Sequence, residues 1–139
     1  MSADYFVDSN VLVYAHDLGA GRKHEVAREL TRRLWRERSG VLSTQVLQEL
    51  YVNVRRKAEQ PVTREEAIAL IEDYRRWQVV VNSEHSIVEA IRIEERFGLS
   101  FWDALIVQAA QSSGAGTLYT EDLSHGQRYG SVSALNPFL

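Results

Sequence analysis

Acidic residues stand at several points where a predicted strand meets a predicted helix or loop. Asp8 directly follows the short apolar run Tyr5-Phe6-Val7. Asp122 comes shortly after a second run, Gly116-Thr117-Leu118-Tyr119-Thr120, and Asp103 lies in the first turn of a strongly apolar predicted helix. Ligands of parallel α/β sheets bind at the carboxyl ends of the strands. We therefore treat these acids as candidates for one site.

Each acid also has a simpler structural explanation. Asp8 has the side-chain type preferred at helix N-caps, and Ser100-x-x-Asp103 resembles a capping box. Glu49, in the helix predicted at 44–57, falls roughly opposite the apolar face, as an exposed helix acid would. It would reach a site only if that side of the helix faces the ends of the strands. For any one acid the structural role is the better interpretation, whereas the four together favour a site.

Four carboxylates at one edge of a sheet limit the possible chemistry. Two carboxylates about 5 Å apart repel by roughly 3 kcal/mol at an effective dielectric constant near 20, so four cannot all stay ionised without a cation or protonation. The chain has no Cys and no obvious His cluster, and oxygen ligands favour Mg²⁺ or Mn²⁺ over Zn²⁺. Because such an ion can activate water and neutralise charge on a phosphoryl group, the acids indicate phosphodiester hydrolysis.

The composition is that of an ordinary globular protein. The chain has 139 residues, of which 45% are hydrophobic and 25% charged, and we expect one domain over residues 1–139. The net charge of −3 argues against bulk electrostatic binding of nucleic acid, but the 14 Arg are clustered. Candidates for phosphate contacts are Arg55, Arg56, Arg75, Arg76 and Arg128.

We expect a cytoplasmic protein with no membrane partner. The first residues lack the basic and apolar regions of a signal peptide. No apolar run approaches the length of a membrane span.

Short apolar runs alternate with amphipathic segments along the chain. Strands are predicted at 5–7, 41–43, 78–81, 116–120 and 132–135. Helices are predicted at 11–15, 24–38, 44–57, 64–74, 84–97 and 101–111. This alternation predicts a three-layer α/β/α domain with a mostly parallel central sheet of about five strands.

Helical periodicity assigns apolar side chains to the core. Trp35 falls on the apolar face of the first long helix, and Ile87, Val88 and Ile91 are expected to point inward from the helix after the third strand. Gly40 is expected to end the first long helix, since Gly is common just past helix C-termini.

Four segments, taken together, resemble the motifs of PIN-domain proteins. They are Phe6-Val7-Asp8-Ser9-Asn10-Val11-Leu12-Val13-Tyr14-Ala15, Ser43-Thr44-Gln45-Val46-Leu47-Gln48-Glu49, Phe101-Trp102-Asp103-Ala104-Leu105-Ile106 and Tyr119-Thr120-Glu121-Asp122-Leu123. Their order and spacing match along nearly the whole chain. The subgroup that the chain most resembles is the small, single-domain VapC-type toxins of bacterial and archaeal toxin–antitoxin pairs.

The resemblance implies a Mg²⁺- or Mn²⁺-dependent endoribonuclease with RNA as its substrate. Carried over by position, the catalytic and metal-binding acids are Asp8, Glu49, Asp103 and Asp122. Asn10 would orient the Asp8 carboxylate by a hydrogen bond, and Ser9 occupies a position where the family often has Ser or Thr near the site.

The resemblance also implies partners, namely a VapB-type antitoxin and a second copy of the chain in a homodimer. Two helices offer apolar side chains for an antitoxin segment, although the same side chains would also suit an ordinary core. They are Leu30, Leu34, Trp35, Leu50, Tyr51 and Val54.

Two other functions stay open on the sequence. The first is a PIN-like module that binds RNA or protein without cutting, against which the complete acidic set argues. The second is a phosphotransfer domain of receiver or haloacid-dehalogenase type. A receiver needs a Lys after its last strand, whereas the only lysines are Lys23 and Lys57. A dehalogenase-type phosphatase needs Asp-x-Asp, whereas this chain has Asp8-Ser9-Asn10.

Overall fold

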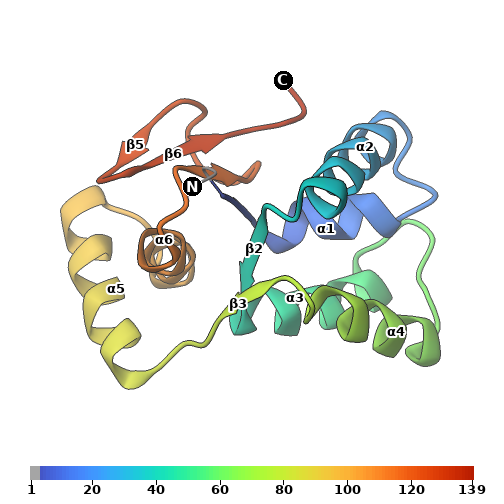
Figure 1. The fold of residues 1–139 in the computed structure, drawn as a ribbon, viewed down its shortest axis with the longest axis horizontal. Coiled ribbons are helices and arrows are strands. Elements are labelled where there is room, and N and C mark those ends of the chain that lie inside the picture. Colours follow the sequence, from blue (N-terminus) through green and yellow to red (C-terminus); the bar gives the residue numbers. More distant parts are fainter. Residues whose placement is uncertain (1–3) are drawn as a thin grey trace.

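The computed structural model describes residues 4–139. Its elements, in chain order, are β1 (Tyr5–Val7), α1 (Ser9–His16), α2 (Arg22–Glu37), β2 (Gly40–Ser43), α3 (Thr44–Arg56), α4 (Arg64–Tyr74), β3 (Gln78–Val80), α5 (Glu84–Phe97), α6 (Phe101–Ser113), β4 (Thr117–Tyr119), β5 (Arg128–Tyr129) and β6 (Val132–Leu135) (Figure 1). The expectation about a signal peptide rests on residues 1–3, which lie outside the described residues. Within residues 4–139, none of the helices combines the length and apolar character of a membrane span.

The strands form one sheet in the order β3-β2-β1-β4-β6-β5. All neighbouring pairs are parallel except β5 and β6, which are antiparallel. The chain builds outward from β1 to β2 and β3, and then returns to add β4 on the other side of β1. The strand order therefore reverses between β1 and β4, which is where ligands of parallel α/β sheets bind.

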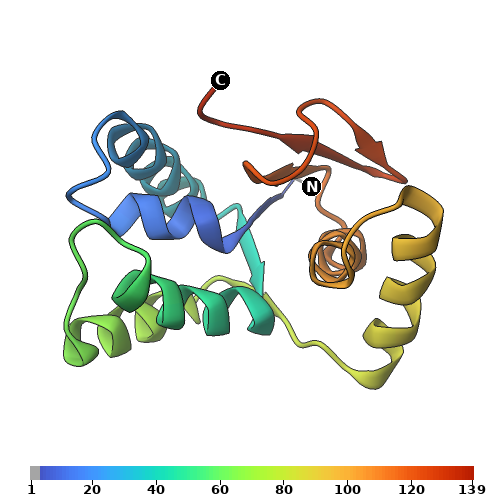
Figure 2. The same ribbon diagram turned by 180° about the vertical axis from the view of Figure 1, so that it is seen from behind.

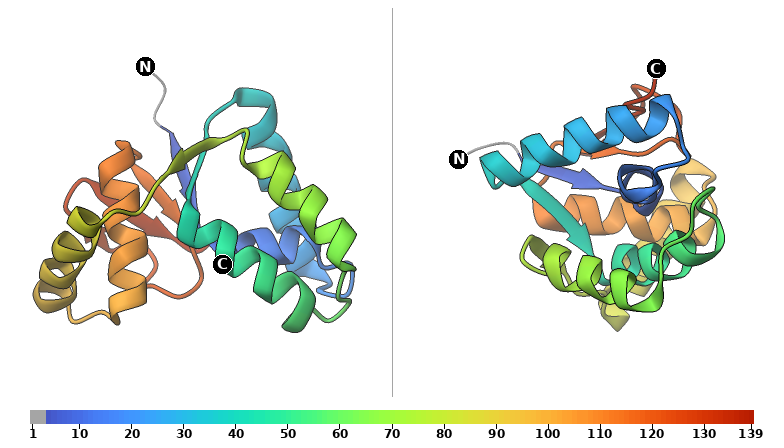
Figure 3. Two further views of the ribbon diagram at one scale, coloured as in Figure 1. Left: turned by 90° about the horizontal axis from the view of Figure 1, so that it is seen from below. Right: turned by 90° about the vertical axis from the view of Figure 1, so that its right-hand side faces the viewer.

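Helices cover the sheet on both sides. Right-handed crossovers that run in one direction along the sheet place their helices on one face, and the return crossover uses the other face. Accordingly α6 packs on β2, β3, β4 and β6 with α5 outside it, whereas α2 and α3 pack on β2 from the opposite side (Figure 3). The predicted three-layer α/β/α architecture with a mostly parallel sheet is confirmed.

The sheet has one strand more than the five that we predicted. The additional strand, β5, has two residues and pairs with β6 at the edge of the sheet, beyond β4 (Figures 1 and 2). A two-residue strand carries no alternation of polar and apolar side chains, so periodicity could not reveal it.

Gly40 does not end α2, contrary to our prediction. The helix ends through Arg38, whose backbone is left-handed with a φ of 54° and whose N–H bonds back to the last turn. Gly40 instead begins β2, where a Cβ atom would come within 2.5 Å of the Trp77 ring. The glycine at this position is thus explained by close packing.

Two helices present apolar side chains to solvent that we predicted to be inside. On α5, Ile87, Val88 and Ile91 are 46%, 49% and 49% exposed, while Ala90 and Ile93 make the contact with the core. Trp35 of α2 is also partly exposed. The inward prediction was wrong because periodicity locates an apolar stripe on a helix but does not tell which of two adjacent stripes packs against the core.

The end of α1 carries a half-buried histidine. The His16 Nε2 atom lies 2.7 Å from the hydroxyl of Tyr74, which is 1% exposed. Burial, together with the nearby His24, lowers the pKa of His16 from 6.5 to about 4. The folded protein therefore keeps this imidazole neutral at pH values where it is charged in the unfolded chain.

This histidine predicts a loss of stability in mild acid. Because the folded pKa lies below the unfolded value, the stabilisation is complete above pH 6.5 and is lost as the pH falls towards 4. We expect His16→Gln to remove about 2 kcal/mol of this acid-dependent decrease in the free energy of unfolding, as measured by urea denaturation. His85→Gln, on the exposed side of α5, is the matched control. Equal pH slopes for wild type and His16→Gln would contradict the prediction.

Candidate active site

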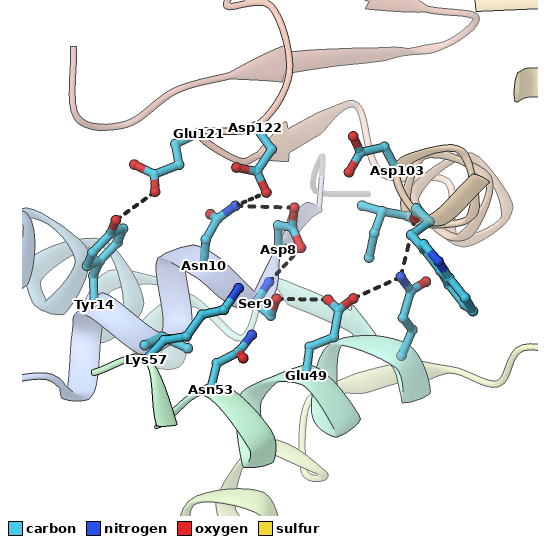
Figure 4. A pocket seen from close by; sticks show the side chains of 14 residues that line it. Asp8, Ser9, Asn10, Tyr14, Glu49, Asn53, Lys57, Asp103, Glu121 and Asp122 are labelled. Carbon is cyan, nitrogen blue, oxygen red and sulfur yellow. Dashed lines mark hydrogen bonds between the residues drawn. The ribbon is translucent and has the colours of Figure 1, made fainter. Parts of the chain in front are cut away.

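A pocket of about 290 Å³ opens at the carboxyl edge of the sheet. Its walls come from the β1–α1 junction, from α3, from the first turn of α6 and from the segment after β4. Figure 4 shows the labelled side chains pointing into it from these elements. The lining includes Asp8, Glu49, Asp103 and Asp122. The structure thus brings together four acids that are far apart in the sequence.

Asp8 is the most deeply buried of these acids. Its side chain is 5% exposed. Oδ1 accepts a hydrogen bond from the Ser9 N–H at 2.7 Å, so that Asp8 is the N-cap of α1, and Oδ2 accepts one from the Thr120 hydroxyl at 2.8 Å. Burial, with repulsion from Glu49 and Asp122, raises the pKa of Asp8 to about 7, although both hydrogen bonds act to lower it. Asp8 therefore both caps α1 and contributes a carboxylate to the pocket.

Asn10 and Thr120 join Asp8 to Asp122. The Asn10 amide donates to Asp122 Oδ2 at 2.9 Å and lies 3.5 Å from Asp8 Oδ2. The Thr120 hydroxyl, which donates to Asp8, also accepts from the Asp122 N–H at 3.1 Å. The predicted contact between Asn10 and Asp8 is present but long, and the shorter bond of Asn10 goes to Asp122.

Glu49 is held from two sides. The Ser9 hydroxyl donates to its Oε1 at 2.8 Å, and the Gln45 amide donates to its Oε2 at 3.1 Å. The same amide also donates to the carbonyl of Trp102, at 3.3 Å, and so links α3 to α6. Glu49 is half-buried on the side of α3 away from the core, as periodicity indicated. This side of the helix does face the ends of the strands.

Asp103 lies across the pocket, in the first turn of α6. Its backbone N–H donates to the hydroxyl of Ser100, the N-cap, at 3.1 Å. Its carboxylate points towards the pocket (Figure 4). Burial, with repulsion from Asp122, raises the pKa of Asp103 above its usual value. The capping interpretation therefore applies to Ser100 and leaves the carboxylate available.

Glu121 lines the same pocket but is already paired. The Tyr14 hydroxyl donates to Oε1 at 2.7 Å, and Lys23 forms a salt bridge with Oε2 at 2.8 Å. Burial, with the neighbouring Glu121 carboxylate, raises the pKa of Tyr14. This cluster ties the segment after β4 to α1 and α2, and so holds the backbone on which Asp122 stands.

Several residues of this pocket were not predicted from the sequence. Thr120 and Gln45 make the bonds described above, and Asn53 and Lys57 also line the pocket. Thr120 had a detectable signal, because a hydroxyl residue ends the apolar run just before the acid pair. The three others stand at four-residue intervals with Glu49 on α3, a pattern that identifies one side of a helix once Glu49 is placed. None of the five arginines proposed for phosphate contacts is among the described residues that line the pocket.

The donor atoms suit a hard divalent cation. The four acids offer only oxygen ligands, which Mg²⁺ and Mn²⁺ prefer. The buried Oδ1 of Asn10 has no hydrogen-bond partner within residues 4–139, which leaves a further acceptor beside Asp8 and Asp122. As these side chains stand, no group of three or more His, Cys, Asp or Glu residues in the described chain is arranged to hold one ion. The residues therefore fit the ion in chemical type but not in a preformed ligand shell.

Comparison with protein families gives a match to the PIN domain over residues 5–129. The chain belongs to the PIN-domain family. Searches among curated protein sequences find no match. In this PIN domain, the pocket described above lies at the edge of the sheet where β1 and β4 end.

Several solved structures share this PIN fold. A toxin–antitoxin complex from Klebsiella pneumoniae has a TM-score of 0.69 at 16% identity, covering 96% of this chain and 98% of that one. A DNA-bound VapBC from Salmonella typhimurium has a TM-score of 0.65 at 19% identity, covering 96% and 97%. VapC20 of Mycobacterium tuberculosis, a toxin that cleaves the sarcin–ricin loop, has a TM-score of 0.63 at 20% identity, covering 83% and 87%.

The pocket of this PIN domain predicts thermal stabilisation by Mg²⁺. A ligand that binds only the folded state raises the unfolding midpoint, and for millimolar Mg²⁺ we expect a rise of about 2–5 °C, measured by differential scanning fluorimetry against EDTA. Asp8→Asn keeps a side chain that can cap α1 but removes the charge, so the rise should disappear. Asp73→Asn, at an exposed acid of α4 outside the pocket, should retain it. An equal rise in wild type and Asp8→Asn would show that Mg²⁺ binds elsewhere.

Proposed function

We propose that this protein is a divalent-metal-dependent endoribonuclease and the toxin of a VapBC-type toxin–antitoxin pair. The observation that carries the proposal is the meeting of four acids, from four separate parts of a PIN fold, in one pocket. Similarity to VapBC and other toxin–antitoxin structures supports the assignment to the toxin. The reaction would be hydrolysis of a phosphodiester bond in RNA.

Asp8, Glu49, Asp103 and Asp122 would hold Mg²⁺ or Mn²⁺. Such an ion, when bound, supplies a water of lowered pKa and charge neutralisation for the phosphoryl group. Asp8 is fixed by its bonds to Ser9 and Thr120, whereas Asp122 is exposed and Glu49 and Asp103 are half-buried. We therefore expect the less buried acids to turn towards the ion and Asp8 to stay in place.

The neighbouring polar residues would position the acids. Asn10 and Thr120 keep the carboxylates of Asp8 and Asp122 side by side despite their repulsion. Ser9 holds Glu49 towards the pocket in the same way. These residues would act through the acids and not on the RNA, which is the usual part of hydrogen-bonding partners around metal ligands.

A VapB-type antitoxin is the proposed protein partner, in a cytoplasmic complex. The apolar side chains that we suggested for its docking are mostly unavailable, because Leu30, Leu34, Leu50 and Val54 are buried in the core. The earlier suggestion of a groove formed by these residues is therefore withdrawn.

The proposed homodimer has a candidate surface on α5. Ile91 lies four residues after Ile87 and three after Val88, which places the three on one side of the helix, and each is about half exposed. Glu84 and Arg92 stand four residues before and after Val88 on this side. Two copies packed antiparallel about Val88 would therefore bring each Glu84 close to the partner helix's Arg92.

Cleavage of RNA by the purified protein tests the main proposal. We expect activity with Mg²⁺ or Mn²⁺ that is lost with EDTA and in Asp8→Asn. Asn10→Ala should reduce the rate about 10- to 100-fold, because it removes a residue that positions two acids. Asp73→Asn, an exposed acid of α4 outside the pocket, is the control and should cleave normally. RNA binding without metal-dependent cleavage would favour the alternative, a non-catalytic PIN-like binding module.

The α5 surface predicts the oligomeric state. Sedimentation equilibrium should show a dimer for the wild type and a monomer for Val88→Glu, since the new carboxylate would be buried without a partner between the helices. Ile68→Glu, a half-exposed position on α4, should stay dimeric. Circular dichroism of both variants checks that folding is unchanged. A dimeric Val88→Glu protein would place the interface on another surface.

A further inference from the structure

One side of α3 forms a polar row along the pocket. Its members are Gln45, Glu49 and Asn53 of α3 and Lys57, the C-cap residue that continues its last turn. They are spaced four residues apart, and all four line the pocket. Residues four apart lie on the same side of a helix and about 6 Å apart along its axis. The row therefore runs from the acidic end of the pocket, at Glu49, for two further turns to Lys57.

The two ends of this row differ in their hydrogen bonding. Gln45 and Glu49 are bonded to each other and to neighbouring residues. The side chains of Asn53 and Lys57, in contrast, have no hydrogen bond or salt bridge to any part of the chain that the structure describes. Figure 4 shows both pointing into the pocket. Two donor groups thus face the pocket without a protein acceptor.

Lys57 also differs in charge from the other residues of the pocket. Among the described residues that line the pocket, it alone carries a positive charge, against five acids. The neighbouring arginines face elsewhere, because Arg55 donates to the Tyr51 hydroxyl at 3.2 Å and Arg56 is exposed outside the pocket. An ammonium group on this rim would attract an anionic ligand that the acids alone would repel.

We propose that Asn53 and Lys57 form a subsite for a phosphate of the RNA strand next to the phosphate that is cleaved. This inference rests on the proposed nuclease function. One turn of α3 separates Glu49 from Asn53 and another separates Asn53 from Lys57, a spacing comparable with that of successive phosphates along an extended strand. The strand would then lie along α3, with one phosphate at the acids and the next at the amide and ammonium groups.

Binding of an RNA oligonucleotide in EDTA, which removes the ion that the proposed cleavage requires, tests this subsite without catalysis. Fluorescence anisotropy at several salt concentrations gives the affinity and its salt dependence. Lys57→Gln should weaken binding by about fivefold and lower the slope of log K against log salt by about 0.7, the value for one phosphate contact on a single strand. Lys57→Arg should keep the wild-type slope, and Asn53→Ala should weaken binding without changing it.

Arg56→Gln is the matched control, because it removes the same charge one residue away on the same helix but outside the pocket. Wild-type behaviour of Arg56→Gln together with the loss in Lys57→Gln supports the subsite. Equal effects of the two substitutions, no effect of either, or no binding by the wild type would overturn it. Metal-dependent cleavage in a protein that is insensitive to Lys57→Gln would leave the nuclease proposal intact and reject the subsite alone. Oligonucleotide binding through Lys57 in a protein that does not cleave RNA would reject the nuclease proposal and leave Lys57 only as a contact to a phosphate of bound RNA.

Discussion

A carboxylate buried at the end of the central strand is the constraint on which the pocket depends. Asp8 is 5% exposed, and a buried charge is costly unless it is hydrogen-bonded or paired. Three groups donate hydrogen bonds to this carboxylate, namely the Ser9 N–H, the Thr120 hydroxyl and, at the longer distance of 3.5 Å, the Asn10 amide. These contacts reduce the cost without removing it, since the pKa of Asp8 still lies near 7. The remaining unfavourable energy is what a cation would relieve, so the same interaction explains both the local architecture and the affinity for metal that we propose.

The order of the strands makes this arrangement possible. Because β1 pairs with both β2 and β4, the segments that follow β1 and β4 are neighbours although they are separated by more than 100 residues. The helix α3, which follows β2, and the helix α6, which precedes β4, enclose the same edge and contribute Glu49 and Asp103. The acids are therefore positioned by the ends of rigid elements, which fixes them more closely than a long loop would.

Local signals in the sequence predicted most of the fold and the acidic residues. Asp8, Thr63 and Ser83 cap helices as their residue types indicated. The partners of the acids were harder to predict, because a bond such as that of Thr120 to Asp8 exists only after two strands have paired. The prediction of which α5 side chains are buried was wrong for a related reason. Ala90 is a weak apolar signal beside Ile87 and Val88, yet close packing against α6 favours the small residue.

The double use of Asp8, as N-cap and as site acid, links the start of α1 to the chemistry of the pocket. Most substitutions at this position would remove the cap of α1, at a cost of about 0.5–2 kcal/mol, and abolish the site together. Asn and Ser are exceptions, because they cap helices about as well as Asp does but carry no charge. A single substitution of Asp8 could therefore give a folded chain without activity. Such a chain would still present α5 and the rest of its surface to other proteins, and could compete with active copies for a shared partner.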